Sequence, residues 1–211
     1  MKKPTIFWDV DTQFDFMMPE GNLYVPGAES IIEKVSVIRK FALENGYSII
    51  SDIDWHSLDN EEISESPDFR DTFPPHCMAG TPGSERVGYL GDIKIDYIGI
   101  EKMPIETLKK ITAPDQYHIV IRKNSLNVFD NPNTDTLIKL INPKRAVIFG
   151  VALEFCVSLV LHGLSRFKNI ELVMLSDAVK GLEPESESKI IDDLRKTGVK
   201  IMEFAEFKRQ L

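Results

Sequence analysis

This sequence of 211 residues contains few cysteines and fewer basic than acidic residues. Only Cys77 and Cys156 are present, which is enough for one bridge but too few for a disulfide framework, so a reducing cytoplasm is the expected compartment. The formal net charge of -8 argues against a nucleic-acid partner, because phosphate binding needs an excess of Lys and Arg. No apolar stretch approaches the length of a membrane span, so we expect no membrane partner either.

The length and composition fit one domain over residues 1–211. A hydrophobic content of 43% is sufficient for a substantial core at this size. We find no repeats, low-complexity tracts or linker that would divide the chain.

Apolar runs with strand character alternate with stretches of helical spacing along the chain. The strand-like runs are Thr5–Val10, Tyr47–Ile53, Ile119–Ile121, Arg145–Gly150, Glu171–Leu175 and Val199–Met202. The helical patterns lie near Ile31–Glu44, Asn133–Ile141, Glu154–Phe167 and Ser186–Thr197. This alternation predicts a three-layer α/β/α fold of Rossmann-like type, with a mainly parallel six-stranded sheet. Ligands then bind beyond the carboxyl ends of the strands.

The stretch Val147–Leu161 predicts a buried strand that turns tightly at Gly150 into a helix. Cys156 falls in the first turn of that helix, where free backbone N–H groups and the helix dipole favour a thiolate. Cys156 is therefore a candidate nucleophile. The alternative is a buried structural cysteine, since free Cys is among the most buried residues.

Two acidic residues mark the end of the first strand. Asp9 and Asp11 fall on one face by the strand period of two. An Asp-x-Asp pair after a buried strand resembles the nucleophile loop of haloacid-dehalogenase-type phosphatases, with Asp9 as the nucleophile. Gln13 does not fit that pattern, which has Thr or Val there. The remaining interpretation is a pair of carboxylates that cap the following loop.

A long acidic segment follows the second strand and carries candidate metal ligands. Asp54 and His56 are spaced to point to one side of an extended backbone, and His76 lies at the far end of the segment. One carboxylate and two imidazoles suit Zn²⁺, Fe²⁺ or Mn²⁺. Three further acids, Glu61, Glu62 and Glu65, are solvated charges or candidates for another ligand.

Lys123 also follows an apolar run and lies at a predicted strand end. Most lysines are simply solvated. A lysine beside a carboxylate and a cysteine would keep its charge and help to hold a thiolate.

Taken together, these residues resemble the isochorismatase-like cysteine hydrolase superfamily, and within it the nicotinamidases (pyrazinamidases), over nearly the whole chain. The first motif is Asp11-Thr12-Gln13-Phe14-Asp15-Phe16, followed by Leu23-Tyr24-Val25-Pro26-Gly27-Ala28. The second is Asp54-Trp55-His56, then Pro75-His76-Cys77 and Gly80-Thr81-Pro82-Gly83. The third is Gly150-Val151-Ala152-Leu153-Glu154-Phe155-Cys156-Val157.

The resemblance implies a role for each matching residue. Asp11, Lys123 and Cys156 would form the catalytic triad, and Asp54, His56 and His76 would bind a divalent metal ion, most often Zn, with Glu65 as a candidate fourth ligand. A cis peptide at Val151–Ala152 would direct the N–H groups of Ala152 and Cys156 into an oxyanion hole. Substrate contacts would come from Phe16, Phe73 and Gln13.

The implied activity is hydrolysis of nicotinamide to nicotinate and ammonia through a thioester, a step of NAD salvage. The partner would then be a small-molecule amide, and a second copy of the chain in a homo-oligomer is a further candidate. Three alternatives stay open: another hydrolase of the superfamily that acts on a different amide or on isochorismate, a phosphatase that uses Asp9, and a binding module without catalysis.

Overall fold

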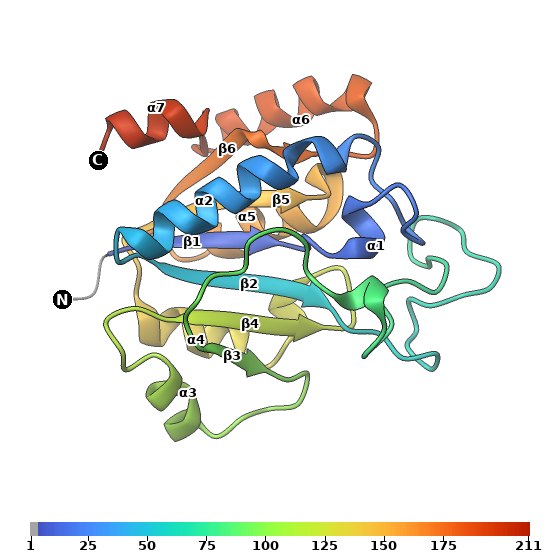
Figure 1. Cartoon of the computed structure of the whole chain (residues 1–211), viewed down its shortest axis with the longest axis horizontal. Coiled ribbons are helices and arrows are strands. Elements are labelled where there is room, and N and C mark those ends of the chain that lie inside the picture. The colour runs from blue at the N-terminus through green and yellow to red at the C-terminus, as the bar shows by residue number, and fades with distance from the viewer. Residues whose placement is uncertain (1–3) are drawn as a thin grey trace.

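The computed structural model describes residues 4–211, so the first three residues of the predicted domain lie outside it. Figure 1 shows one sheet with helices on both of its faces. The sheet has seven strands in the order β3-β4-β2-β1-β5-β6-β7, and every pair is parallel. The predicted three-layer α/β/α architecture is therefore confirmed, with one strand more than expected.

The seven strands differ in burial: the inner five are mostly buried, as expected for a parallel sheet covered on both faces, and the two edge strands are partly exposed. The strands are β1 (Thr5–Val10), β2 (Ser48–Asp54), β3 (Ile95–Ile98), β4 (His118–Lys123), β5 (Arg145–Val151), β6 (Glu171–Lys180) and β7 (Lys200–Met202). The additional strand is β3, at the sheet edge. Its sequence Ile-Asp-Tyr-Ile is only partly buried, so it lacks the continuous apolar run that marks the other strands.

The α-helices of the described residues form the outer layers. They are α1 (Phe14–Met17), α2 (Ile32–Glu44), α3 (Ile105–Ile111), α4 (Thr134–Ile141), α5 (Ser158–Ser165), α6 (Pro184–Lys196) and α7 (Phe204–Arg209). Shorter helical turns are η1 (Ala28–Ile31), η2 (Pro82–Ser84), η3 (Val128–Asp130) and η4 (Leu153–Val157). The sequence did not predict α1, α3 and α7, which have four, seven and six residues and are too short for a clear helical period.

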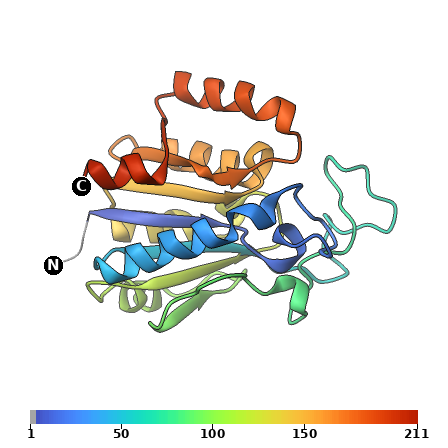
Figure 2. The same ribbon diagram turned by 45° about the horizontal axis from the view of Figure 1, so that its top comes forward.

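The core consists of two layers, one on each face of the sheet. Neighbouring residues of a strand enter opposite layers, as Phe7 and Trp8 show. Phe7 packs with residues of α2 and α7, whereas Trp8 packs with residues of α3, α4 and α5. Figure 2 shows the helices on either side of the sheet. No helix of the described residues is long and apolar enough to cross a membrane.

The segment between β2 and η2 extends beyond the carboxyl ends of the strands, at the right of Figure 1. The carboxyl ends of β1, β2, β4 and β5 all meet at this edge because the strands are parallel. The fold therefore brings Asp11, Asp54, Lys123 and the turn after β5 to one place, as the sequence predicted.

Candidate active site

The turn between β5 and α5 holds Cys156. Gly150 has a φ of 123°, and a Cβ there would lie 2.0 Å from the carbonyl oxygen of Val10, so only glycine fits beside β1. The Val151–Ala152 peptide is cis, as the family resemblance implied. The chain then forms the helical turn η4, which contains Cys156 and leads into α5. The predicted strand, turn and helix are confirmed, except that η4 precedes the regular helix.

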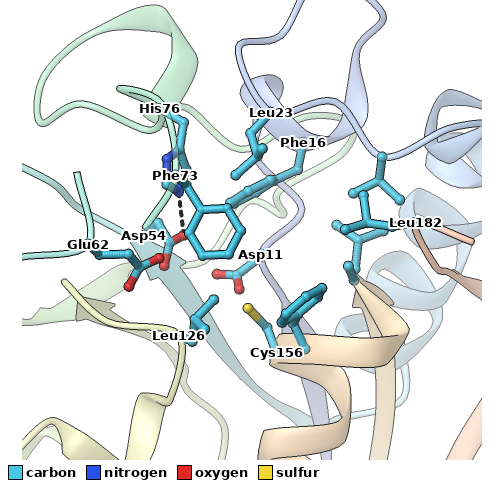
Figure 3. Close-up of a pocket in the computed structure, with 14 residues that line it drawn as sticks. Asp11, Phe16, Leu23, Asp54, Glu62, Phe73, His76, Leu126, Cys156 and Leu182 are labelled. Carbon is cyan, nitrogen blue, oxygen red and sulfur yellow. Dashed lines mark hydrogen bonds and ion pairs between the residues drawn. The ribbon is translucent and has the colours of Figure 1, made fainter. Parts of the chain in front are cut away.

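Three side chains converge beneath a cavity at this edge of the sheet. Asp11 follows β1 in a left-handed conformation with a φ of 45°, and Lys123 is the last residue of β4. The Lys123 Nζ lies 3.0 Å from Asp11 Oδ2 and 3.7 Å from Cys156 Sγ. Figure 3 shows Asp11 and Cys156 side by side at the cavity. The structure thus brings together the three residues that the sequence analysis selected.

The surroundings of Cys156 differ from the expectation of a stabilised thiolate. Burial raises the pKa of the Cys156 thiol well above its ordinary value, and the nearby Asp11 carboxylate raises it further. Lys123 acts in the opposite direction but is outweighed. The expected lowering of this pKa was wrong, because loss of solvent outweighs the helix end. Cys156 therefore holds its proton at rest, and a base must take that proton.

Asp11 has the properties of such a base. Burial raises its pKa well above the ordinary value, the Asp54 carboxylate adds to this, and Lys123 opposes both. A carboxyl group with a raised pKa accepts and returns a proton more readily near neutral pH than an ordinary aspartate. Lys123 has a raised pKa because its carboxylate neighbours outweigh the effect of burial, so it stays charged.

Asp9 does not share a face with Asp11, which corrects the sequence prediction. The strand ends at Val10, and the left-handed turn at Asp11 breaks the period of two. Asp9 points to the other layer, where its carboxylate accepts hydrogen bonds from Arg39 Nε at 2.9 Å and from Thr12 Oγ1 at 2.9 Å. Burial alone would raise the pKa of Asp9, but the Arg39 and Arg86 guanidiniums hold it below its usual value. This carboxylate has a structural role.

Asp54, His56, Glu62 and His76 form a group suited to a divalent metal ion. One potential ligand atom from each lies within 4.8 Å of those of the others, and all four residues are buried. Neither ring nitrogen of His56 has a hydrogen-bond partner among the described residues, and Glu62 Oε1 also lacks one. Buried polar atoms are rarely left unpaired, so these orphaned atoms fit a bound cation.

The ring of His76 is already oriented for such an ion. Its Nδ1 lies 2.8 Å from the carbonyl oxygen of Pro74, and its Nε2 lies 3.3 Å from Asp54 Oδ2 (Figure 3). Donation from Nδ1 to the carbonyl leaves Nε2 free to bind a metal. The fourth member of the group is Glu62, whereas Glu65 is exposed and lies outside it. The sequence alone did not show which of these acids joins the metal group, because the segment has no regular structure that fixes where each side chain points.

The cavity above Cys156 is mainly apolar and aromatic. Phe16 and Phe73 line it, as the resemblance implied, and so do Leu126, Phe155 and Leu182. The ring centroids of Phe73 and Phe155 lie 6.1 Å apart, nearly perpendicular. Such walls suit a flat aromatic ring. Sequence reasoning missed Leu126 and Leu182, which come from loops where an isolated leucine carries no signal.

Gln13 does not line this cavity, which corrects its expected role in substrate binding. Its Nε2 donates to the carbonyl oxygens of Asp54 at 2.8 Å and Ser84 at 3.0 Å, and its Oε1 accepts from the Asp54 N–H at 2.7 Å. Gln13 therefore holds the backbone of a metal-group residue in place.

The sequence analysis also did not predict a role for Glu154, which holds in place a loop that lines the cavity. Its carboxylate accepts hydrogen bonds from the backbone N–H groups of Leu182 at 2.9 Å and Glu183 at 3.1 Å. It thereby ties the turn that carries Cys156 to the loop that carries Leu182. In the sequence it is one residue of the third motif and carries no signal of this role.

Comparison with known proteins supports the resemblance. The family model described as the isochorismatase domain matches residues 100–206. A nicotinamidase of Schizosaccharomyces pombe is 26% identical over 92% of this chain and 90% of its own length.

Solved structures share the fold. A pyrazinamidase of Pyrococcus horikoshii, solved in complex with zinc, has a TM-score of 0.71 and 29% identity, covering 95% of this chain and 99% of its own. A nicotinamidase of Bacillus subtilis has a TM-score of 0.73 at 19% identity, covering 96% of this chain and 100% of its own.

Proposed function

This chain belongs to the isochorismatase family, and we propose that it is a metal-containing cysteine amidohydrolase that converts nicotinamide into nicotinate and ammonia. This is a step of NAD salvage. The observation that carries the proposal is the convergence of Cys156, Asp11 and Lys123 beneath an aromatic cavity. The similarity to a yeast nicotinamidase along most of both chains supports the choice of substrate.

The reaction begins with a proton transfer from the Cys156 thiol to the Asp11 carboxylate. Lys123 stays positively charged throughout and stabilises the thiolate, since its Nζ lies 3.7 Å from Sγ. The sulfur attacks the carboxamide carbon and forms a C–S bond, and the carbonyl oxygen gains negative charge. The N–H groups of Ala152 and Cys156 are the proposed donors to that oxygen, a type of contact whose loss typically reduces turnover by about 10²–10³-fold.

Asp11 then returns the proton to the departing nitrogen. The C–N bond breaks, ammonia leaves, and a thioester joins the acyl group to Cys156. Water attacks the thioester while Asp11 accepts a proton from it. The C–S bond breaks, Asp11 passes this proton to the departing sulfur, and the acid leaves, which restores the thiol and the Asp11 carboxylate. One amide and one water are consumed for each acid and ammonia released.

Asp54, His56, Glu62 and His76 are the proposed ligands of a divalent ion, with Zn²⁺ favoured by two imidazoles and two carboxylates. The zinc complex of the similar pyrazinamidase supports this choice. When bound, the ion supplies a fixed positive charge beside the cavity, able to hold a ring nitrogen or a water. The acyl chemistry itself belongs to Cys156 and Asp11.

Two other functions are less well supported. A phosphatase that used Asp9 would need that carboxylate in the cavity, but Asp9 is fully buried and bonded to Arg39. A different hydrolase of the same superfamily would share the three central residues. The aromatic walls of the cavity favour a ring-bearing amide over an aliphatic one.

The test is ammonia release from nicotinamide by the purified, metal-loaded protein. One sample is treated with iodoacetamide and another with a chelator, and isochorismate and an aliphatic amide serve as alternative substrates. We expect release from nicotinamide that alkylation abolishes and chelation strongly reduces. Release that survives alkylation would contradict the thioester route, and preference for another substrate would contradict the nicotinamide assignment.

A further inference from the structure

A second cavity lies on the opposite face of β2 and β4 from the active site. Asp54 of β2 lines the active-site cavity and Lys123 of β4 lies against Cys156, whereas their neighbours Ile53 and Arg122 line the second cavity. The alternation of side chains along a strand separates the two sites. The second cavity holds about 350 Å³. In Figure 1 the green segment that follows η2 crosses in front of these strands, and its residues Glu85, Arg86 and Leu90 line the cavity.

Arg86 contributes a buried cation with an unused donor. Its side chain is only 4% exposed, and its NH1 lies 2.7 Å from Ser51 Oγ and 2.9 Å from His118 Nε2. The NH2 group of Arg86 is buried and has no hydrogen-bond partner among the described residues. An unpaired donor on a buried cation is costly, so Arg86, which lines the cavity, has hydrogen-bonding capacity left for a ligand.

Arg122 contributes a second cation at the same cavity. Its guanidinium carbon lies 3.9 Å from the ring centroid of Trp55 and 4.9 Å from that of Tyr97. These cation–π contacts fix the plane of the guanidinium without using its N–H groups. Its Nε has no hydrogen-bond partner in residues 4–211.

The charge around this cavity is positive in balance. Arg39 and Arg86 share one buried carboxylate, that of Asp9, which lies 2.8 Å from Arg39 NH2 and 3.5 Å from Arg86 NH1. Arg122 adds a further cation at the cavity. Among the described residues that line the cavity, the one carboxylate is that of Glu85, an exposed residue. A phosphate monoester carries a charge of about −1.5 to −2 at neutral pH. Its charge is therefore attracted to this positive balance more strongly than the single charge of a carboxylate.

We propose that this cavity binds the phosphate group of a small phosphorylated molecule between Arg86 and Arg122. Arginine guanidiniums bind phosphate oxygens through paired, charge-assisted hydrogen bonds. The site is separate from the amide chemistry, so its binding is measured without reference to turnover.

The test is calorimetric titration of the metal-loaded protein at constant ionic strength with inorganic phosphate, ribose 5-phosphate and acetate. We expect binding of one phosphate-bearing ligand per chain, and far weaker binding of acetate. Tighter binding of ribose 5-phosphate than of phosphate would identify an organic phosphate as the ligand, and the reverse would identify the free ion. Absence of binding at millimolar phosphate, or equal binding of acetate, would overturn the proposal.

Two variants locate the site. Arg122→Gln should weaken phosphate binding about tenfold or more, because a charge-assisted pair is lost. Arg70→Gln removes the same charge from a side chain that is 87% exposed, and should leave binding unchanged. Loss of binding in His56→Ala with retention in Arg122→Gln would instead place the phosphate at the metal group and refute the second site.

Fluorescence gives an independent readout. Trp55 lies in the cavity, and the only other tryptophan, Trp8, is fully buried and bonded to Asp52. Ligand binding beside Arg122 should change the Trp55 emission saturably, and Trp55→Phe should remove that change. An unchanged signal in Trp55→Phe would show that the ligand binds elsewhere.

Discussion

Asp54 and Lys123 are register partners on β2 and β4, and their side chains form a buried ion pair. Asp54 Oδ1 accepts from Lys123, while Asp54 Oδ2 lies 3.3 Å from His76 Nε2. One carboxylate thus joins the metal group to the residues around Cys156. Burial alone would raise the pKa of Asp54, but Lys123 and the two histidines hold it well below its usual value. Asp54 is therefore ionised, as a ligand of a divalent ion must be.

Replacement of Lys123 by Met should make the Cys156 thiol harder to ionise, because a cation 3.7 Å from the sulfur is removed. We expect the pH profile of iodoacetamide alkylation to move to higher pH, together with a lower kcat. The matched control is Lys110→Met on α3, an exposed position. An unshifted alkylation profile in Lys123→Met would show that Lys123 does not hold the thiolate.

Replacement of Cys156 by Ala should abolish ammonia release, a loss on the order of 10³-fold or more for a nucleophile. Metal content should stay at the wild-type level, because Cys156 is not part of the metal group. His56→Ala should behave in the opposite way and lose the metal. Elemental analysis beside the activity assay separates the two, and full activity of Cys156→Ala would falsify the mechanism.

Replacement of Arg39 by Met should destabilise the fold strongly. It leaves the Asp9 carboxylate of β1 buried without its main partner, a change that typically costs about 3–5 kcal/mol. Urea unfolding measures the loss, with Lys40→Met as control, since Lys40 is 61% exposed on the same helix. The double variant Asp9→Leu/Arg39→Met should recover part of the loss. A loss below about 1 kcal/mol in Arg39→Met would mean that Arg86 and Thr12 are enough to stabilise the buried Asp9 carboxylate.

Stability should fall in acid through His118. Burial lowers its pKa to about 3, and the Arg86 charge contributes to that lowering. Between this value and the ordinary pKa of about 6.5, the unfolded chain binds a proton that the folded chain does not. The free energy of unfolding therefore rises with pH across this window, by at most about 1.4 kcal/mol per unit from this group.

His118→Gln should remove that part of the pH dependence. The difference in unfolding free energy between wild type and variant, from urea titrations at pH 7, 6 and 5, should move in favour of the variant as the pH falls. His162→Gln, at an exposed position of α5, is the control. A difference that does not change with pH would show that His118 keeps an ordinary pKa in the fold.

The sequence alone determined the architecture and the main catalytic candidates. Runs such as Ile119–Ile121 and Val147–Phe149 are apolar without interruption, and a strand buried on both faces needs this pattern whatever its surroundings. Because parallel strands end at one edge, the positions of Asp11, Asp54 and Lys123 at strand ends were enough to bring them together. The resemblance added the aromatic residues Phe16 and Phe73, which do line the cavity.

Only the tertiary structure decided the features that depend on where individual side chains point and on how far they are shielded from solvent. The left-handed turn at Asp11 separates it from Asp9, and the irregular segment after β2 brings Glu62 rather than Glu65 to the metal group. Gln13 bonds to backbone instead of lining the cavity. Burial reversed the expected pKa shift of Cys156. Such outcomes arise from contacts between distant segments, which local pattern and propensity do not encode.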